Sequence, residues 1–317
     1  MSGLARRLLG YAALCGVIGG IALMDHPFWI QLTIGIAIVA ILALAWDILA
    51  RSGQVSLGTA AFFGLGTYTT SMVAPLVGIV AAWLAIIVVC AVAAILLGVL
   101  TLRLRRMYFA IATLGFSLSL QVVVLIFPDQ TGGAGGTAPP LLAGGDPRLQ
   151  LLLLGLLLSG AMIASDILLS RRFRPAFFMI RTMPELAAAS GVPVVRSKML
   201  AFVVSGVIAG LTGACYGGLY GYVVPGDVFT TSWSVLPLAV AILGGVDTTF
   251  GPVLGAVLLK LLEEGARSAV GGAGYQAVYG AVIILFVVAL PQGLTGLVRR
   301  IVKPGGPVSP AVSTVRV

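Results

Sequence analysis

The sequence predicts an all-α, polytopic helical membrane protein, and three observations support this prediction. Hydrophobic residues make up 59% of the chain and charged residues only 9%, whereas a soluble domain carries roughly a quarter charged residues. The apolar residues form long runs, and about 20 such residues cross the hydrocarbon core of a membrane. Short loops with turn residues and charges separate the runs. Because lipid offers no partners for backbone polar groups, each run is expected to be helical.

The apolar runs follow one another along most of the chain. The first begins after Arg6 and Arg7, which could also introduce a signal peptide. No small-x-small cleavage site precedes Asp25 and another apolar run follows at once, so we expect a retained first span. Pro75 and Gly78 are turn residues that separate the third run from the fourth. In order, the runs cover residues 8–24, 28–49, 60–74, 80–102, 108–127, 149–169, 199–222, 233–262 and 276–297.

The charges in the loops predict the orientation. Cytoplasmic loops of membrane proteins carry an excess of Lys and Arg, and a cytoplasmic N-terminus places the basic loops on that side. These loops contain Arg51, then Arg103, Arg105 and Arg106, then the segment from Arg171 to Lys198. The remaining loops would be external, and they contain Asp25, Asp129, Asp146 and Asp227, with Arg148 as the only cation in the first three of these loops.

The run 233–262 contains a predicted chain reversal. Glycines, Asp247 and Pro252 stand together between residues 244 and 252, which is typical of a turn. Splitting the run there gives about ten spans and places Asp247 near the cytoplasm. It also brings both termini inside, including Arg299, Arg300 and Lys303. The alternative is a re-entrant pair of half-helices plus one span, which gives nine spans.

The sequence shows no catalytic, metal or nucleotide site. The single histidine, His26, has no cysteine or carboxylate cluster near it. No glycine-rich loop is followed by Gly-Lys-Ser/Thr, so the chain has no P-loop and any ATP must be used by a partner. No basic stripe is interleaved with aromatic residues, so we expect no nucleic-acid partner. We expect no enzyme activity, no metal and no cofactor, and we interpret Cys15, Cys90 and Cys215 as packing residues.

Residues 52–58 form the most informative polar segment. Backbone that is not helical at membrane depth is tolerated only where it is buried in protein or lines a wet cavity. Gln54 and Ser56 could then offer hydrogen bonds to a solute, whereas an ordinary cytoplasmic turn with a helix cap is the alternative. Gly244 and Gly245 supply the comparable break in the C-terminal half. The two breaks predict a translocation path through Gln54, Ser56, Gly58, Gly244 and Gly245.

Residues 52–58 also begin a series of five motifs. The first is Gly53-Gln54-x-Ser56-Leu57-Gly58, followed by Ala60, Gly64, Gly66 and Tyr68. The others are Arg103-x-Arg105-x-x-Tyr108-Phe109-Ala110, Thr131-Gly132-Gly133-x-Gly135-Gly136, Lys198-x-Leu200-Ala201-Phe202, and Leu243-Gly244-Gly245 with Phe250-Gly251-Pro252. In this order they resemble the branched-chain amino-acid ABC transporter permeases of the LivM type, the inner-membrane component of binding-protein-dependent transport systems. The resemblance covers about residues 45–262.

The resemblance implies a permease subunit of an ABC importer that passes branched-chain amino acids or similar small solutes inward. The implied partners are a second permease subunit of the LivH type, two cytoplasmic ATPase subunits, a periplasmic solute-binding protein and the lipid of the inner membrane. The transmembrane permease domain would cover residues 1–303, with a cytoplasmic coupling loop at about 170–198 and a disordered tail at 304–317. The ATPase-coupling residues would be Arg174, Arg181, Glu185, Ala188 and Gly191.

The coupling loop departs from the family pattern in one respect. The family's acidic cluster is reduced to Glu185, which leaves the solute and the ATPase pairing open. Thr182 and Glu185 have the spacing of a capping box, with Pro184 in the first helical turn. A short helix over residues 186–190 would end at Gly191. The alternative is a basic loop held at the lipid headgroups.

Small residues recur every four positions in the seventh run. Gly206, Gly210, Ala214 and Gly218 would lie on one helix face and let a neighbouring helix approach closely. We expect packing within this chain, and a contact with a partner permease is the alternative.

An ion-coupled secondary transporter and a channel are the competing functions. A carrier uses intramembrane carboxylates or paired charges. Only Asp47, Asp166 and Lys260 come near this description, and each can lie close to the end of a span. No repeated filter-like segment supports a channel. The solute stays open between a branched-chain amino acid, another amino acid, urea and a short amide, and the permease pair could be homo- or heterodimeric.

Overall fold

The computed structural model describes residues 2–23, 26–104, 106–170, 173–270, 280–281 and 293–295, and within them it is built from helices. One isolated β-bridge, between Thr137 and Val223, is the exception. In this described part, seven helices are long and apolar enough to cross a membrane. The prediction of an all-α polytopic membrane protein is confirmed.

The N-terminal half contains five long helices. They coincide with the first five predicted runs apart from small shifts of the ends. Pro75 lies inside the last turn of its helix, and the break comes three residues later at Gly78. The helices are α1 (Ser2–Leu23), α2 (Pro27–Arg51), α3 (Thr59–Val77), α4 (Ile79–Thr101) and α5 (Arg106–Ile126).

The C-terminal half alternates long and short helices. The predicted reversal within residues 233–262 is confirmed, because the chain breaks between α12 and α13. The count of ten spans stays a prediction, because residues 276–297 lie almost wholly outside the described part. The elements are α6 (Pro128–Thr131), η1 (Gly133–Gly135), η2 (Leu142–Gly145), α7 (Pro147–Leu168), α8 (Arg174–Thr182), α9 (Pro184–Ala189), α10 (Val194–Tyr220), α11 (Pro225–Val228), α12 (Ser232–Gly244) and α13 (Gly251–Val270).

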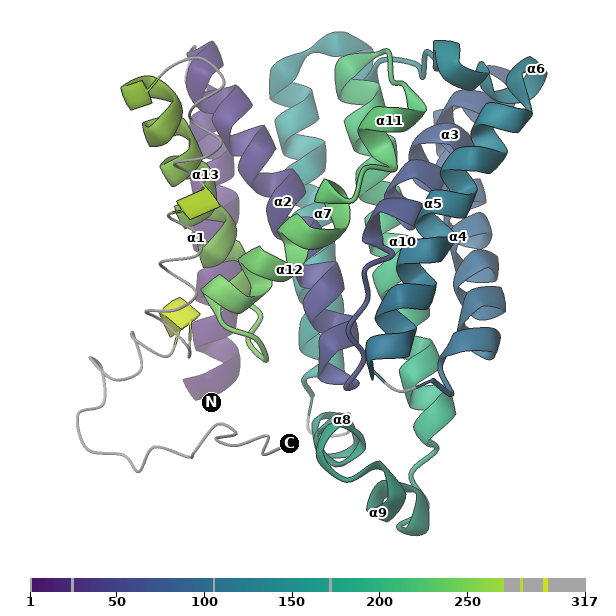
Figure 1. Ribbon diagram of the computed structural model, residues 1–317. Coiled ribbons are helices and arrows are strands. Elements are labelled where there is room, and N and C mark those ends of the chain that lie inside the picture. Colours follow the sequence, from purple (N-terminus) through teal and green to yellow (C-terminus); the bar gives the residue numbers. More distant parts are fainter. Residues whose placement is uncertain are drawn as a thin grey trace.

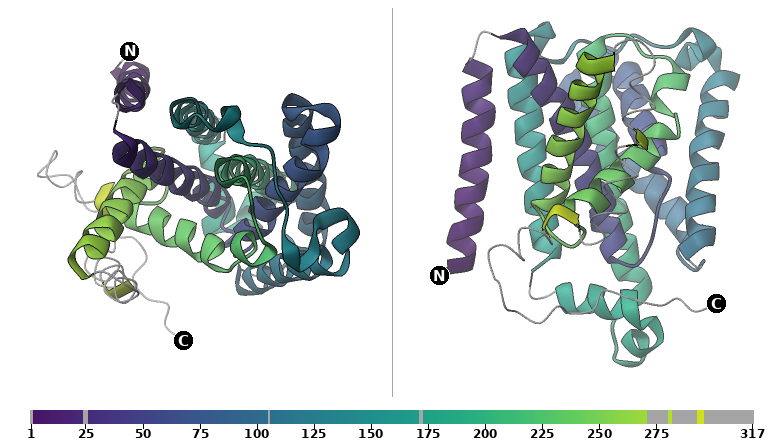
Figure 2. Two further views of the ribbon diagram at one scale, coloured as in Figure 1. Left: turned by 90° about the horizontal axis from the view of Figure 1, so that it is seen from above. Right: turned by 60° about the vertical axis from the view of Figure 1, so that its left-hand side comes forward.

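Helix α2 forms the centre of the bundle. Every residue from Ala37 to Leu49 is buried, and the helix packs against α7, α10, α12 and α13. A helix that is apolar on all sides is expected to be enclosed by protein or lipid, and here the protein encloses it. Helix α1 stands at the edge of the bundle, where it packs mainly on α7 (Figure 2).

Small residues bring α3 and α10 into very close contact. A Cβ at Gly66 would lie 1.8 Å from the carbonyl oxygen of Gly210, and one at Gly213 would lie 1.9 Å from that of Phe63. The predicted small-residue face is also used within the chain, since Gly206 packs on the Phe62 ring. Packing within the chain is therefore confirmed for this face: Gly210 lies against Cys90, Ala214 is buried, and Gly218 lies against Leu142.

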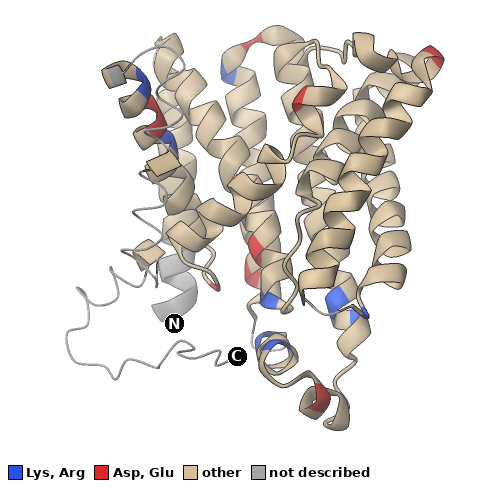
Figure 3. Cartoon of the chain, viewed as in Figure 1, with Lys and Arg blue, Asp and Glu red and all other residues tan. Residues whose placement is uncertain are grey.

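The two ends of the bundle differ in their charges. Helices α8 and α9 lie across one end, and α6 and α11 lie at the other (Figure 1). Positions of acidic residues are coloured red at the second end in Figure 3. There α6, the N-cap of α7 and α11 carry Asp129, Asp146 and Asp227. The predicted acidic residues therefore gather at one end among the described residues, and Arg148 lies there with them. Which end faces the cytoplasm stays a prediction, and Asp25, Arg105, Arg171, Arg299, Arg300, Lys303 and the tail at 304–317 lie outside the described residues.

Candidate functional site

Two breaks in the helices meet near α8. We call residues 52–58, between α2 and α3, the first break, and residues 245–250, between α12 and α13, the second break. The first break touches α8 directly, because a Cβ at Gly53 would lie 3.1 Å from the Cα atom of Arg181. The sequence placed Arg181 in the coupling loop and the breaks on the solute path. The structure places Gly53 of the first break and Asp247 of the second break against Arg181, and these two are neighbours of the predicted path residues along the chain.

The first break is closed by its own hydrogen bonds. The Ser52 hydroxyl donates to the Leu49 carbonyl at 2.7 Å, and the Ser56 hydroxyl accepts from the Gly58 amide at 3.0 Å. The Trp46 indole donates to the Ser56 carbonyl at 3.0 Å. These bonds satisfy backbone groups that leave the helical pattern, as a buried loop requires. The first break is therefore a compact turn whose polar side chains are buried.

Gln54 is the least satisfied residue of the first break. Its side chain is only 1% exposed, and its Nε2 atom lies 3.5 Å from the Leu102 carbonyl oxygen, at the limit of a hydrogen bond. Its Oε1 atom is buried and has no partner among the described residues. An unsatisfied buried amide is uncommon in folded proteins. The assignment of Gln54, Ser56 and Gly58 to the solute path stays a prediction.

The second break has an unusual backbone. Gly245 has φ +109°, and Asp247 has φ +70°, a value that residues other than glycine rarely adopt. The Thr248 hydroxyl donates to the Gly245 carbonyl at 3.0 Å and accepts from the Gly251 amide at 3.0 Å, so it holds the turn and the start of α13 together. The Asp247 amide donates to Oδ1 of Asp47 at 3.1 Å, which ties the second break to α2.

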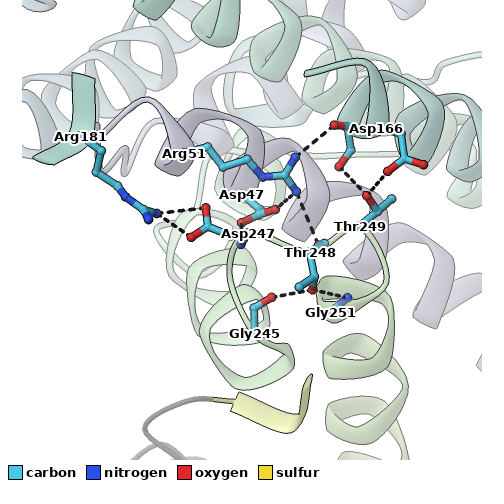
Figure 4. Close-up of polar contacts among 10 residues, drawn as sticks. Asp47, Arg51, Asp166, Arg181, Gly245, Asp247, Thr248, Thr249 and Gly251 are labelled. Atoms are coloured by element: carbon cyan, nitrogen blue, oxygen red, sulfur yellow. Dashed lines mark hydrogen bonds and ion pairs between the residues drawn. The ribbon is translucent and has the colours of Figure 1, made fainter. Parts of the chain in front are cut away.

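Four charged residues join α2, α8 and the second break, and we call them the polar junction: Asp47, Arg51, Asp247 and Arg181 (Figure 4). Arg51 forms an ion pair with Asp47, four residues earlier on α2, and both side chains are buried. Arg51 also donates to the Ser165 carbonyl on α7 at 3.1 Å. Buried charges must be paired and hydrogen-bonded because desolvation is costly.

The second ion pair of the polar junction is more open to solvent. Nη1 of Arg181 on α8 donates to Oδ2 of Asp247 at 2.7 Å and to Oδ1 at 3.0 Å. The Arg181 side chain is 30% exposed and that of Asp247 is 42% exposed. This pair links α8 to the second break. A movement of α8 can therefore reach the backbone between α12 and α13 through one contact.

The other two charges that the sequence singled out, Asp166 and Lys260, lie apart from each other and each has its own polar partners. Asp166 on α7 accepts hydrogen bonds from Thr249 of the second break and from Tyr11 on α1. Lys260 lies on α13 and pairs with Glu263 at 2.8 Å. Asp47, Asp166 and Lys260 thus all have polar partners in the structure, although Asp47 is wholly buried. Within the described ranges, no group of three or more His, Cys, Asp or Glu side chains could hold a metal ion.

A cavity of about 560 Å³ opens beside the polar junction, and we call it the junction cavity. A smaller cavity of about 180 Å³ shares Arg174, Asp247 and Thr248 with it and extends to Asp166. The polar lining of the junction cavity comes from Arg51, Arg174, Arg181, Asp247 and Thr248, and the rest of its lining from Leu168, Leu169, Pro175, Phe177, Phe178 and Val246.

The coupling loop forms two helices, α8 and α9, and one prediction about it is wrong. Thr182 does not cap α9, because it belongs to the last turn of α8 and its hydroxyl donates to the Phe178 carbonyl at 2.8 Å. The N-cap of α9 is Met183, which has no side-chain acceptor to offer. Because the Thr182 hydroxyl bonds to the backbone of α8, it does not cap α9.

The predicted end of the second loop helix is confirmed. Gly191 has φ +79°, and its amide donates to the Ala188 carbonyl at 3.0 Å while the Val192 amide donates to the Ala187 carbonyl at 3.0 Å. This pair of bonds is a Schellman motif, which favours glycine at its left-handed position. The side chains of Arg174, Glu185 and Ala188 are exposed, and so is Gly191. Their assignment to ATPase coupling stays a prediction.

The polar junction could be predicted only in part from the sequence. Asp47 and Arg51 stand four residues apart, which places them on one helix face and was a signal for their pairing. The pairing of Arg181 with Asp247 joins residues 66 positions apart, and no local pattern indicates it.

Comparison with known proteins adds family information. The family described as branched-chain amino acid transport system / permease component matches residues 29–287. The chain is similar to the high-affinity branched-chain amino acid transport system permease protein LivM of Salmonella typhimurium, with 28% identity over 292 residues, and to that of Escherichia coli, with 28% identity over 284 residues. Each comparison covers 80% of this chain and 66% of the relative, so the chain spans just under two thirds of the relatives' length. No solved structure gives a significant match.

Proposed function

The chain belongs to the branched-chain amino acid transport system / permease component family, and from this premise we propose that it is the transmembrane permease subunit of an ABC importer. The solute is a branched-chain amino acid or a similar small molecule, and it moves inward across the inner membrane. Seven described helices that can cross a membrane support a multi-pass subunit. The chain has no P-loop, so a separate ATPase supplies the energy.

The link between α8 and the second break carries this proposal. Two cytoplasmic ATPases would bind α8 and α9, which lie across one end of the bundle (Figure 1). The bidentate contact of Arg181 with Asp247 would transmit their motion to the second break. The exposed positions of α8, α9 and the turn after α9 would contact the ATPase, and they include Arg174, Glu185, Ala188 and Gly191.

The solute path would run past both breaks. Gln54, Ser56 and Gly58 lie on the first break, and Gly244 and Gly245 adjoin the second. Discontinuous helices are how many transporters expose backbone groups to a solute. Gln54, Ser56 and these glycines carry no charge, so the path would bind the solute weakly. Selectivity would then reside in a periplasmic solute-binding protein, and a second permease subunit of the LivH type would complete the path.

Reconstitution of the assembled importer in proteoliposomes tests this function. With ATPases, binding protein and the second permease present, we expect uptake of labelled leucine that requires ATP inside the vesicles and continues after an ionophore collapses ion gradients. The purified chain alone should hydrolyse no ATP.

The same measurement separates the importer from an ion-coupled carrier. The buried carboxylate of Asp47 and the hydrogen-bonded carboxylate of Asp166 are the features that favour a carrier, since such groups can bind a coupling ion. Uptake that needs no ATP and stops with the ionophore would establish the carrier and refute the importer.

A further inference from the structure

We propose that the junction cavity is a binding site for an α-amino acid with an aliphatic side chain, entered from the end of the bundle that carries α8. The proposal rests on the function proposed above and adds a defined solute site within this single chain. The site is separate from the weak path past Gln54. Three properties of the junction cavity support it: a guanidinium for a carboxylate, a carboxylate for an ammonium group, and an apolar wall.

The cationic part of the junction cavity fits a carboxylate. Arg174 makes no ion pair with any described residue, in contrast to Arg51 and Arg181. Arg51 is 3% exposed, and its buried Nε atom has no hydrogen-bond partner in the described part of the chain. Guanidinium groups bind carboxylates through paired hydrogen bonds, which are among the strongest in proteins. A ligand carboxylate would therefore bind at Arg174, which lines the junction cavity together with Arg51.

The anionic part of the junction cavity fits an ammonium group. Asp247 keeps 42% of its side chain exposed while it pairs with Arg181, so its oxygens can accept further hydrogen bonds. A ligand with only negative charge would offer no ammonium donor to the Asp247 oxygens, and one with only positive charge would be repelled by the three arginines of the lining. A zwitterion satisfies both, which selects an amino acid over a simple anion or amine.

The apolar wall selects the side chain of the ligand. Leu168, Leu169, Phe177 and Val246 line the junction cavity beside its charged groups. An aliphatic side chain gains free energy in proportion to the apolar area that it buries there, whereas a carboxylate or amide would lose its hydrogen bonds to water. The volume of about 560 Å³ lies within the range of about 300–1,000 Å³ that is typical of small-molecule sites.

Binding of leucine to the full-length chain in lipid nanodiscs tests the site. We expect saturable binding of tritiated leucine without ATPase or binding protein. 4-Methylpentanoate lacks the ammonium group and isopentylamine lacks the carboxylate, so each should compete at least about tenfold more weakly than leucine. Glutamate should also compete poorly. Absence of saturable binding, or equal competition by the analogues with one charge, would overturn the proposal.

Substitutions in the lining provide the second test. Arg174→Ala and Asp247→Asn should each weaken leucine binding at least about tenfold, and Arg174→Lys should weaken it less. Arg103→Ala is the matched control, because Arg103 is an exposed arginine that does not line the junction cavity. Unchanged binding in Arg174→Ala would refute the site. If Arg174→Ala also lowers the melting temperature, the test rests on Arg174→Lys, which should still bind leucine more weakly than the wild type does.

Chemical protection locates the bound leucine. Cys15 is exposed, whereas Cys90 and Cys215 are buried, so Cys15→Ser gives a background of low reactivity. In that background, leucine should slow the reaction of Leu169→Cys with a maleimide. Binding without protection would place leucine elsewhere and overturn the proposal.

The two proposals fail in different ways. ATP-driven uptake together with absent nanodisc binding would refute the junction site alone. Leucine binding with protection at position 169, together with uptake that ignores ATP, would refute the importer and leave the site in place.

Discussion

The two breaks in the helices differ in how they satisfy their polar groups. In the first break, Ser52, Gln54 and Ser56 are at most 4% exposed, and their bonds are mainly to neighbouring residues. In the second break, Asp247 is 42% exposed and bonds to both α2 and α8. The second break also lines a cavity. Both breaks lie against α8, but only the second is joined to it by an ion pair, that of Asp247 with Arg181.

The difference shows why similar sequence patterns need not have similar roles. Both breaks combine glycine with polar residues at the end of an apolar helix. The first is surrounded by α5 and the end of α4, as the bond from the Leu57 amide to the Thr113 hydroxyl at 3.0 Å shows. The second lies at the edge, where solvent reaches it. We therefore expect substitutions in the first break, which is enclosed by other helices, to have different effects from substitutions in the second break, which pairs with α8.

The largest effect is expected from Gly245→Leu in the second break. A Cβ there would lie 1.9 Å from the Thr295 hydroxyl, and φ +109° disfavours any side chain. Uptake in proteoliposomes should be abolished, with normal membrane insertion. Gly58→Leu should do the same, because a Cβ at Gly58 would lie 3.0 Å from the Thr113 carbonyl oxygen.

Alanine at the same positions sharpens the comparison. Gly245→Ala should lose more uptake than Gly58→Ala, because Gly245 has both a close contact and positive φ, whereas Gly58 has the close contact alone. Gly115→Leu is the control, since nothing lies within 4 Å of a Cβ at this helical glycine. Equal losses in both alanine variants would contradict the distinction between the two breaks.

The next largest effect concerns the buried ion pair. Asp47→Ala leaves Arg51 unpaired at 3% exposure, so the free energy of unfolding in mixed micelles should fall by about 3–5 kcal/mol. Adding Arg51→Met to Asp47→Ala should recover most of this loss, because the unpaired charge is then removed. A loss that persists in the double variant would show that Asp47 acts mainly through its bond to the Asp247 amide.

A smaller effect on stability, but a clear one on transport, is expected from Arg181→Ala combined with Glu185→Ala. The Arg181–Asp247 pair is partly exposed, so it contributes only about 0–1 kcal/mol to stability. Uptake should fall about tenfold or more while the ATPases continue to hydrolyse ATP, since the contact that we propose to transmit their motion is lost. Arg103→Ala, at an exposed arginine outside the coupling loop, serves as control. Wild-type uptake in the double variant would remove the coupling assignment.

The smallest effect is expected from Gln54→Ala. The side chain makes one hydrogen bond of marginal length, 3.5 Å to the Leu102 carbonyl oxygen, so the uptake rate should fall about two- to fivefold. The order of preference among leucine, isoleucine and valine should not change. A switch in preference would show that the first break contains a specific solute site, and the hypothesis of a path that binds the solute weakly would be wrong.

The sequence by itself determined the long apolar helices, their interruptions and the family, but it did not predict the short helix α8. Apolar runs, Gly78 and the reversal at residues 244–252 were sufficient because lipid allows few alternatives for an apolar segment and because turn chemistry is local. The small-residue face with Gly206 and Gly210 was also correctly interpreted, since close approach needs small side chains wherever it occurs. Thr182 shows the limit of local patterns, because its hydroxyl had two possible acceptors and bonded to its own helix.

Only the tertiary structure decided which of these distant residues contact one another. Asp247 lies 200 residues from Asp47 along the chain and 66 from Arg181, yet it contacts both. The cavity between α7, α8 and the second break follows from the same arrangement. Such contacts depend on how the helices pack, and packing is set by side-chain shape over the whole bundle. A sequence pattern describes only residues that are close along the chain. It could therefore point to these residues but could not predict that they contact one another.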